Sequence, residues 1–166
     1  MSVTPFVPAE HLLSLLNEGD IVEFLPGPDF LTEDKCVLYI GDVVTEKDGK
    51  KVKLDHQVLY VCSMQQEDEF EFDIKIDIED LVSFARGRPC RKDNSGDAKW
   101  TPFHQELIKR RAIGRIGEKR RTDALTCNCE SMVNWCRYNV NCSIQFYSGL
   151  CEYEGDMFDI CRQLFK

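Results

Sequence analysis

Residues 126–136 read Thr-Cys-Asn-Cys-Glu-Ser-Met-Val-Asn-Trp-Cys. Asn128 is a favourable N-cap residue, so this stretch predicts a helix that begins at Cys129. Four apolar side chains then recur at i, i+3, i+4 and i+7, the spacing of one helix face: Cys129, Met132, Val133 and Cys136. That face needs an apolar surface to pack against, which the rest of the chain has to supply.

The segments before this helix have the pattern of strands. Short apolar runs occupy residues 20–24, 36–40 and 56–61, and residues 70–76 alternate apolar with charged side chains. Asp48-Gly49 is the dipeptide of a tight hairpin turn. We therefore expect these strands to form one antiparallel sheet, with the Cys129 helix packed on it.

Further helices are expected after the strands. One is capped by Asp77 and ends near Gly87, one opens at Thr101-Pro102 and ends at Gly117, and a last one covers residues 157–164. Residues 89–100 are polar and are expected to form a loop. Strands followed by helices predict an α+β fold with an antiparallel sheet.

The length of 166 residues and the mass of 19.2 kDa indicate one domain. No stretch is long and apolar enough to span a membrane, and residues 1–10 lack the pattern of a secretory signal. Nine cysteines without such a signal indicate reduced thiols in a cytoplasmic protein, not a disulfide scaffold. Cys127 and Cys129 are separated by one residue, whereas zinc ligands are typically separated by two to four. Neither a metal nor a cofactor is therefore expected.

The net charge of −8 argues against a nucleic-acid-binding protein. Residues 104–121 are nevertheless basic, with seven Lys and Arg against two Glu. They form either a solvated helix face or a patch for anionic lipid headgroups or a phosphorylated partner. The basic residues proposed for such a patch are Lys109, Arg110, Arg111, Arg120 and Arg121.

Cys129 is the strongest candidate for chemistry. The N-terminus of a helix favours a thiolate and can stabilise an oxyanion with free backbone N–H groups. The alternative is a thiol that only fills the core, since free cysteine is often buried. A cysteine nucleophile needs a base, and of the three histidines we favour His56 over His11 and His104, which are expected to have surface, packing or capping roles.

Four segments in this order resemble the lecithin:retinol acyltransferase-like (LRAT) family. Residues 19–24 are similar to its Gly-Asp-aliphatic-aliphatic-Glu opening, and residues 36–42 to its His-x-x-aliphatic-Tyr-aliphatic-Gly-Asp strand. Arg110-Arg111-Ala112 with Gly117 resembles its Arg-Ala…Gly helix. Residues 128–138 resemble its Asn-Cys-Glu-His-Phe-Val…Cys-Arg-Tyr-Gly block.

This resemblance implies a circularly permuted papain-like fold over residues 18–140, between an N-terminal extension of residues 1–17 and a C-terminal extension of residues 141–166 that packs on the domain. It also implies a thiol acyltransferase or lipid hydrolase in lipid metabolism. Family members transfer an acyl group from a phospholipid to the cysteine, here Cys129, and then to an acceptor.

The chain departs from the family pattern at its histidines. The first histidine, the general base, aligns with Cys36, and the histidine after Cys-Glu is Ser131. The second histidine, which orients the base, aligns with His56 across an insertion that contains residues 47–53. In a rival register His56 aligns with the first histidine, but no Gly-Asp follows it.

Two functions remain open from the sequence. The first is a cysteine-dependent acyltransferase or phospholipase, with Cys129 as nucleophile, His56 as base and Cys36 at the altered position. The second is a pseudoenzyme that binds a protein partner or an anionic membrane. Both fit a cytoplasmic protein, peripheral to membranes in the second case.

Overall fold

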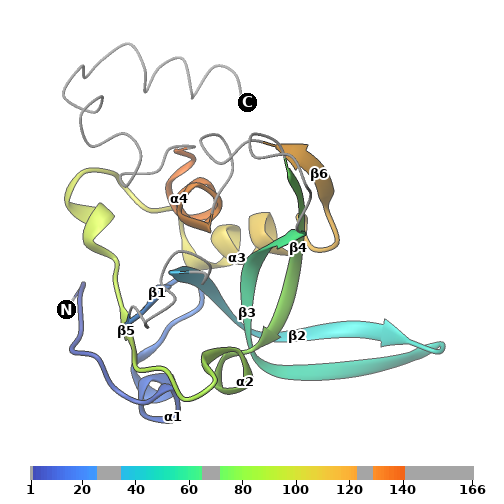
Figure 1. Ribbon diagram of the computed structural model, residues 1–166, viewed down its shortest axis with the longest axis horizontal. Coiled ribbons are helices and arrows are strands. Elements are labelled where there is room, and N and C mark those ends of the chain that lie inside the picture. The colour runs from blue at the N-terminus through green and yellow to red at the C-terminus, as the bar shows by residue number, and fades with distance from the viewer. Residues whose placement is uncertain (1, 26–34, 65–71, 123–128, 141–166) are drawn as a thin grey trace.

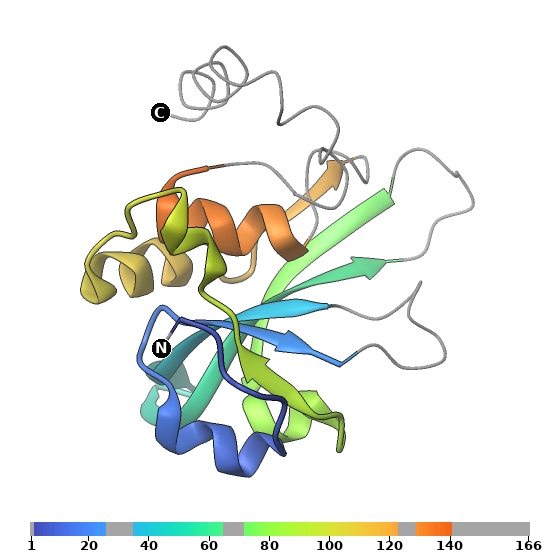
Figure 2. The same ribbon diagram turned by 90° about the vertical axis from the view of Figure 1, so that its left-hand side faces the viewer.

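The computed structural model describes residues 2–25, 35–64, 72–122 and 129–140. The chain folds as an α+β domain around a six-stranded antiparallel sheet with the strand order β5-β1-β2-β3-β4-β6 (Figure 1). Helices α3 and α4 lie on one face of the sheet, and α1 and α2 lie towards the other (Figures 1 and 2). No helix in these ranges is long and apolar enough to cross a membrane.

The elements alternate along the chain more than the sequence suggests. The strands are β1 (Ile21–Phe24), β2 (Cys36–Lys47), β3 (Lys50–Met64), β4 (Phe72–Asp80), β5 (Cys90–Lys92) and β6 (Lys119–Thr122). The α-helices are α1 (Ala9–Leu12), α2 (Leu81–Ala85), α3 (Gln105–Ile113) and α4 (Cys129–Tyr138), with short 3₁₀ turns at Leu13–Leu15 and Ser95–Ala98.

The predicted four-stranded core of the sheet is confirmed. Strand β2 pairs with β1 and β3, and β3 pairs with β4, all antiparallel. The turn between β2 and β3 falls on Asp48-Gly49, as predicted, and both residues have positive φ. Strands β2 and β3 are longer than their apolar runs, because both continue as a hairpin beyond the rest of the sheet (Figure 1).

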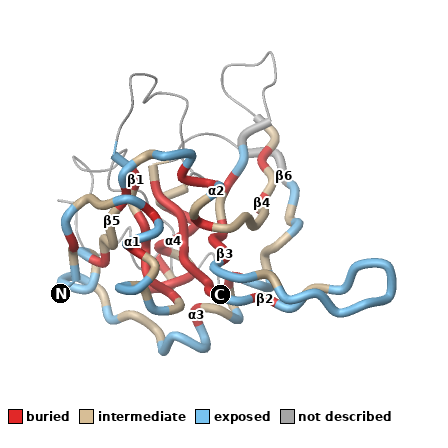
Figure 3. Tube along the Cα trace, turned by 90° about the horizontal axis from the view of Figure 1, so that it is seen from below, coloured by how far each residue is buried: buried red, intermediate tan, exposed pale blue. Residues whose placement is uncertain are grey.

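Alternation along the strands gives the sheet two apolar faces. Cys36, Leu38 and Ile40 of β2 point into a cluster with α3 and α4, and the intervening Val37 and Tyr39 point into a second cluster with α1 and α2. Figure 3 shows buried segments on α4 and through the central strands. The predicted stripe of α4 packs into the first cluster, where Met132, Val133 and Cys136 are buried and Cys129 is partly buried.

Four expectations about the elements were wrong. Asp80, not Asp77, caps α2 by accepting a hydrogen bond from the Ser83 N–H, and residues 77–80 extend β4 instead. Residues 89–100 contain strand β5, which pairs with β1. Helix α3 begins at Gln105 and ends at Ile113. The basic residues after it form β6, which pairs with β4, since local composition does not report long-range pairing.

Two close approaches fix the start of the sheet against the helices. A Cβ atom on Gly19 would lie 2.9 Å from Ile108 of α3, and one on Gly41 would lie 2.8 Å from the Glu18 carboxylate. Both glycines also have positive φ. The backbone beside Gly41 is held by Lys109, whose Nζ donates to Glu18 Oε1 at 2.7 Å and to the Asp42 carbonyl at 2.6 Å.

Candidate active site

Cys129 is the first residue of α4, and its partly buried side chain packs against the cluster that contains Cys36. The expected N-cap, Asn128, and the expected last helix at residues 157–164 lie outside the described residues. None of the five cysteines in the described ranges forms a disulfide. Cys136, two turns further along α4, is fully buried, and desolvation raises its pKa to about 12. Cys129 and Cys136, at the two ends of the apolar stripe of α4, therefore differ in their access to solvent.

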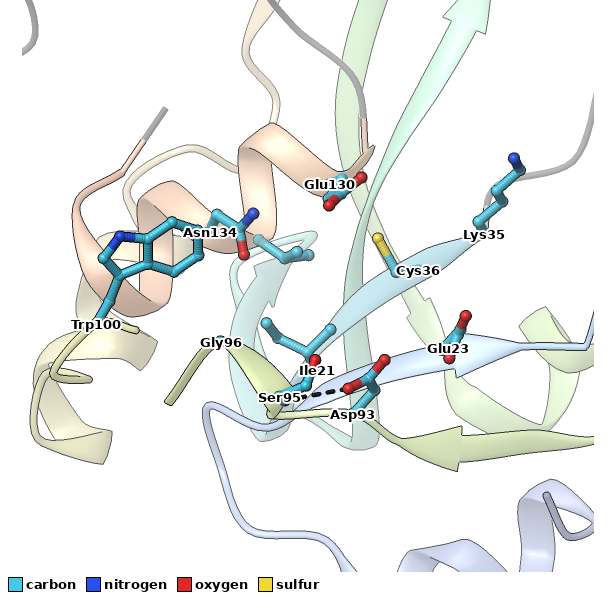
Figure 4. Close-up of a pocket in the computed structure, with 11 residues that line it drawn as sticks. Ile21, Glu23, Lys35, Cys36, Asp93, Ser95, Gly96, Trp100, Glu130 and Asn134 are labelled. Atoms are coloured by element: carbon cyan, nitrogen blue, oxygen red, sulfur yellow. Dashed lines mark hydrogen bonds between the residues drawn. The ribbon is translucent and has the colours of Figure 1, made fainter. Parts of the chain in front are cut away.

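A cavity of about 270 Å³ lies between the first turns of α4, the edge of the sheet and the segment after β5 (Figure 4). In Figure 4 the Cys36 sulfur points towards the turn of α4 that carries Glu130. The residues that line the cavity are Ile21, Glu23, Lys35, Cys36, Asp93, Ser95, Gly96, Trp100, Glu130, Val133 and Asn134. Four of them, Asp93, Ser95, Gly96 and Trp100, lie in residues 89–100, which were expected to form a polar loop and were not selected as site residues.

The cavity carries carboxylates beside the Cys36 thiol. Glu23 is the cross-strand partner of Cys36, so both side chains point to the same face. Burial raises the pKa of Glu23, although Arg91 Nε donates to Glu23 Oε2 at 2.7 Å and opposes the shift. Asp93, which is close to Arg91, raises the pKa of Glu23 further. The cavity therefore combines the Cys36 thiol with an Arg91-bound carboxylate.

His56 lies at a different place, on the other side of the sheet. Its Nδ1 is 2.9 Å from the hydroxyl of Tyr39, which belongs to the cluster with α1 and α2. Leu38 pairs with Leu59, so His56 lies about five residues, or roughly 16 Å, along the strands from Cys36. The structure does not bring His56 to Cys36 or to the first turn of α4, which argues against His56 as the base.

The other two histidines are also remote from Cys129. His11 is exposed on α1, whose buried residues pack on the opposite face of the sheet. His104 precedes α3, next to Phe103, whose N–H bonds the Arg137 carbonyl. Arg137 is eight residues along α4 from Cys129, about 12 Å. All three histidines of the chain are among the described residues, and none reaches the start of α4.

Two of the basic residues proposed for a surface patch, Lys109 and Arg111, are engaged within the protein. The Lys109 ammonium is bound by Glu18 and the Asp42 carbonyl. The Arg111 guanidinium stacks on the Trp135 ring at 3.8 Å and donates to the Trp135 carbonyl at 2.8 Å. Arg110 is exposed. Arg120 and Arg121 belong to β6, and their side chains are outside the described atoms.

One group that the sequence analysis passed over anchors the far end of α4. Arg137 donates from Nη2 and Nε to the two oxygens of Asp97, at 2.8 and 3.0 Å, and from Nη1 to the Gly19 carbonyl at 2.8 Å. The Tyr138 hydroxyl donates to the same carboxylate at 2.6 Å. Burial alone would raise the pKa of Asp97, but these hydrogen bonds lower it. The sequence signal for this anchor was the Arg137-Tyr138 pair, which belongs to the motif at residues 128–138.

A scan against protein families matches residues 17–142 to the family described as lecithin retinol acyltransferase. The chain belongs to this family. The match covers the sheet and α4 and excludes most of the two ends of the chain. A comparison with curated proteins found no match. Membership in the LRAT family associates the chain with acyl transfer, lipid metabolism and phospholipid acyl donors.

The alignment of the family's first histidine needs a correction by one residue. The strand pattern has eight positions, whereas residues 36–42 supply seven, so counting back from Gly41-Asp42 places the histidine at Lys35. Lys35 and Cys36 both line the cavity, and neither is an imidazole. A protonated lysine amine donates hydrogen bonds and cannot accept a proton.

Among the described residues, no group of three His, Cys, Asp or Glu side chains is arranged to hold a metal ion.

Proposed function

We propose that this LRAT-family protein has lost histidine-dependent acyl transfer and acts as a binding module that keeps the family's fold. The observation that carries the proposal is the position of the histidines. His56 bonds Tyr39 on the far face of the sheet, while Lys35 and Cys36, at the start of β2, line the cavity beside α4. Without a histidine within reach of Cys129, no imidazole accepts the proton of its thiol.

The test is turnover of a short-chain phospholipid by the full chain. We expect no release of fatty acid from diheptanoylphosphatidylcholine that depends on Cys129, with Cys129→Ala as the matched control. Lys35→His and Cys36→His are designed to restore a base, an effect typically worth about 10²–10⁴-fold in rate. Multiple turnovers by the unmodified chain, abolished in Cys129→Ala, would overturn the proposal whether or not either histidine variant is active.

A second candidate function is a slow reaction in which the Cys129 thiol is modified once per chain and is not regenerated. It is favoured by the partly exposed position of this residue at the start of a ten-residue helix, where the helix dipole favours a thiolate. We expect iodoacetamide at pH 8 to modify Cys129 much faster than Cys136, whose pKa is about 12. His56→Ala should leave the rate unchanged. Equal labelling of the two thiols, read by peptide mass spectrometry, would reject this candidate.

The proposed binding includes an anionic membrane surface, for which Arg110 and Lys119 are exposed residues of the basic segment. Vesicles that contain phosphatidylserine should bind the chain at low salt and release it as salt screens the charges, over about 10 Å at 0.1 M. Arg110→Ala should weaken binding more than Arg111→Lys, because Arg111 is engaged with Trp135. Binding that is insensitive to salt and to Arg110→Ala would exclude this partner.

A further inference from the structure

The hairpin formed by residues 43–54 projects from the domain and pairs only with itself among the described residues (Figure 1). Pairing of β1 with β2 ends at Leu38, and pairing of β4 with β3 ends at Gln57. Beyond these points no described strand lies on the outer side of either hairpin strand. The hairpin is largely exposed in Figure 3, and its valines Val44 and Val52 are 65% and 37% exposed.

The turn fixes which backbone groups face outwards. Asp48 and Gly49 have φ values of 53° and 75°, as in the type I′ turn of a two-residue hairpin. Lys47 and Lys50 flank this turn and form a hydrogen-bonded pair, so the next pair, Glu46 with Lys51, is of the non-bonded type. By the same alternation, Lys51 and Lys53 direct their N–H and C=O groups to the free edge of β3.

The two edges of the hairpin differ in charge. The β3 side carries Lys50, Lys51 and Lys53, whereas residues 43–47 on the β2 side carry one glutamate and one lysine. Lys53 contacts Asp42 and Asp55 at 3.3 and 3.5 Å, but these pairs are exposed and exert a weak attraction. Lysines on a free edge oppose pairing with neutral or basic strands. An acidic strand is the one that the same charges attract.

We propose that the free edge of β3 at Lys50–Leu54 is a docking site for an extended acidic segment of a partner protein, which adds to the sheet as a strand. Lys51 and Lys53 share one face, and Val52 and Leu54 share the other. The segment that fits therefore alternates acidic with apolar side chains. The site is independent of whether Cys129 reacts, so failure of the proposed function leaves it intact.

The test uses the full chain and a fluorescent peptide of four Glu-Val repeats. Binding should protect the Lys51 and Lys53 amides from hydrogen exchange. Lys51→Pro removes one outward N–H and one positive charge and should weaken binding about tenfold. Glu46→Pro, directly across the hairpin on the other edge, is the matched control and should not weaken it. Lys50→Glu replaces the repulsion between Lys50 and its cross-strand partner Lys47 with an attraction, so this variant should remain folded. It should also weaken binding of the acidic peptide.

Three results would overturn the proposal. The first is an equal loss of affinity in the two proline variants, with both folded by circular dichroism. The second is equal binding of a scrambled peptide of the same composition, because charge alone would then account for it. The third is a monomer–dimer equilibrium that Lys51→Pro shifts and the peptide does not, which would identify a second copy of this chain as the occupant.

Discussion

The two ends of α4 have opposite properties. At the first turn, Cys129 is partly exposed and none of the chain's histidines lies beside it. At the last turn, Arg137 and Tyr138 are buried and share the carboxylate of Asp97. The last turn is held by buried polar contacts to Asp97 and Gly19, whereas the first turn presents a thiol to solvent. Stability and reactivity can therefore be tested separately within one helix.

The largest effect should come from the buried end. Arg137→Met removes the hydrogen bonds to Asp97 and to the Gly19 carbonyl and leaves the Asp97 carboxylate without its cation, so it should reduce the free energy of unfolding by about 3 kcal/mol. Urea denaturation measures the loss. Arg110→Met, the same substitution at an exposed position of α3, should change it by less than about 0.5 kcal/mol. Similar values for the two variants would contradict the contrast between a buried anchor and a solvated surface.

A smaller effect is expected from Tyr138→Phe. The variant loses a hydrogen bond of 2.6 Å to a charged group, which should reduce the free energy of unfolding by about 2 kcal/mol. The control is Tyr39→Phe, which loses a neutral hydrogen bond to His56 and should reduce it by about 1 kcal/mol. Thermal unfolding followed by circular dichroism compares the pair, and a larger loss for Tyr39→Phe would reverse the ranking.

The pH dependence of the free energy of unfolding tests the role of the Asp97 carboxylate. Its pKa is lowered in the fold, so its charged form stabilises the protein above the unfolded pKa of about 3.9, and this stabilisation is lost as the pH falls through the folded value. Asp97→Asn should therefore be less stable than the parent chain at pH 7, and the difference should narrow below about pH 4. A difference that is constant from pH 7 to pH 3, measured in urea, would exclude the carboxylate as its source.

The smallest effect belongs to the other end of the helix. Cys129→Ser should change the free energy of unfolding by less than about 1 kcal/mol, since the side chain is partly exposed at the helix start. Cys136→Ser places a hydroxyl in the apolar cluster and should reduce it by about 1–3 kcal/mol. A larger loss for Cys129→Ser would indicate that this thiol is a structural residue.

Periodicity predicted the parts of the fold that depend on local pattern. The stripe of α4 and the four central strands follow from spacings of 3.6 and 2 residues, and Asp48-Gly49 predicts its own turn. Strands β5 and β6 are short and polar, so only their partners β1 and β4 define them. The candidate site was harder to predict from the sequence, because its geometry depends on strand register. Cys129 could be selected from its helix, but the separation of His56 from Cys36 requires the pairing of β2 with β3.

The junction between the sheet and its hairpin contains two irregularities that compensate each other. Between the pairs Tyr39–Val58 and Gly41–Gln57, strand β2 has one extra residue; between Gly41–Gln57 and Val43–Leu54, strand β3 has one extra residue. The second lies at His56, whose φ is +53°. The offsets cancel, so the hairpin keeps the facing of the sheet. Since β2 and β3 have the same number of residues between the pairs Tyr39–Val58 and Val43–Leu54, a one-residue deletion in one arm of the hairpin beyond the bulges would make the arms unequal. Such a deletion would shift the register by one residue, which moves side chains to the opposite face.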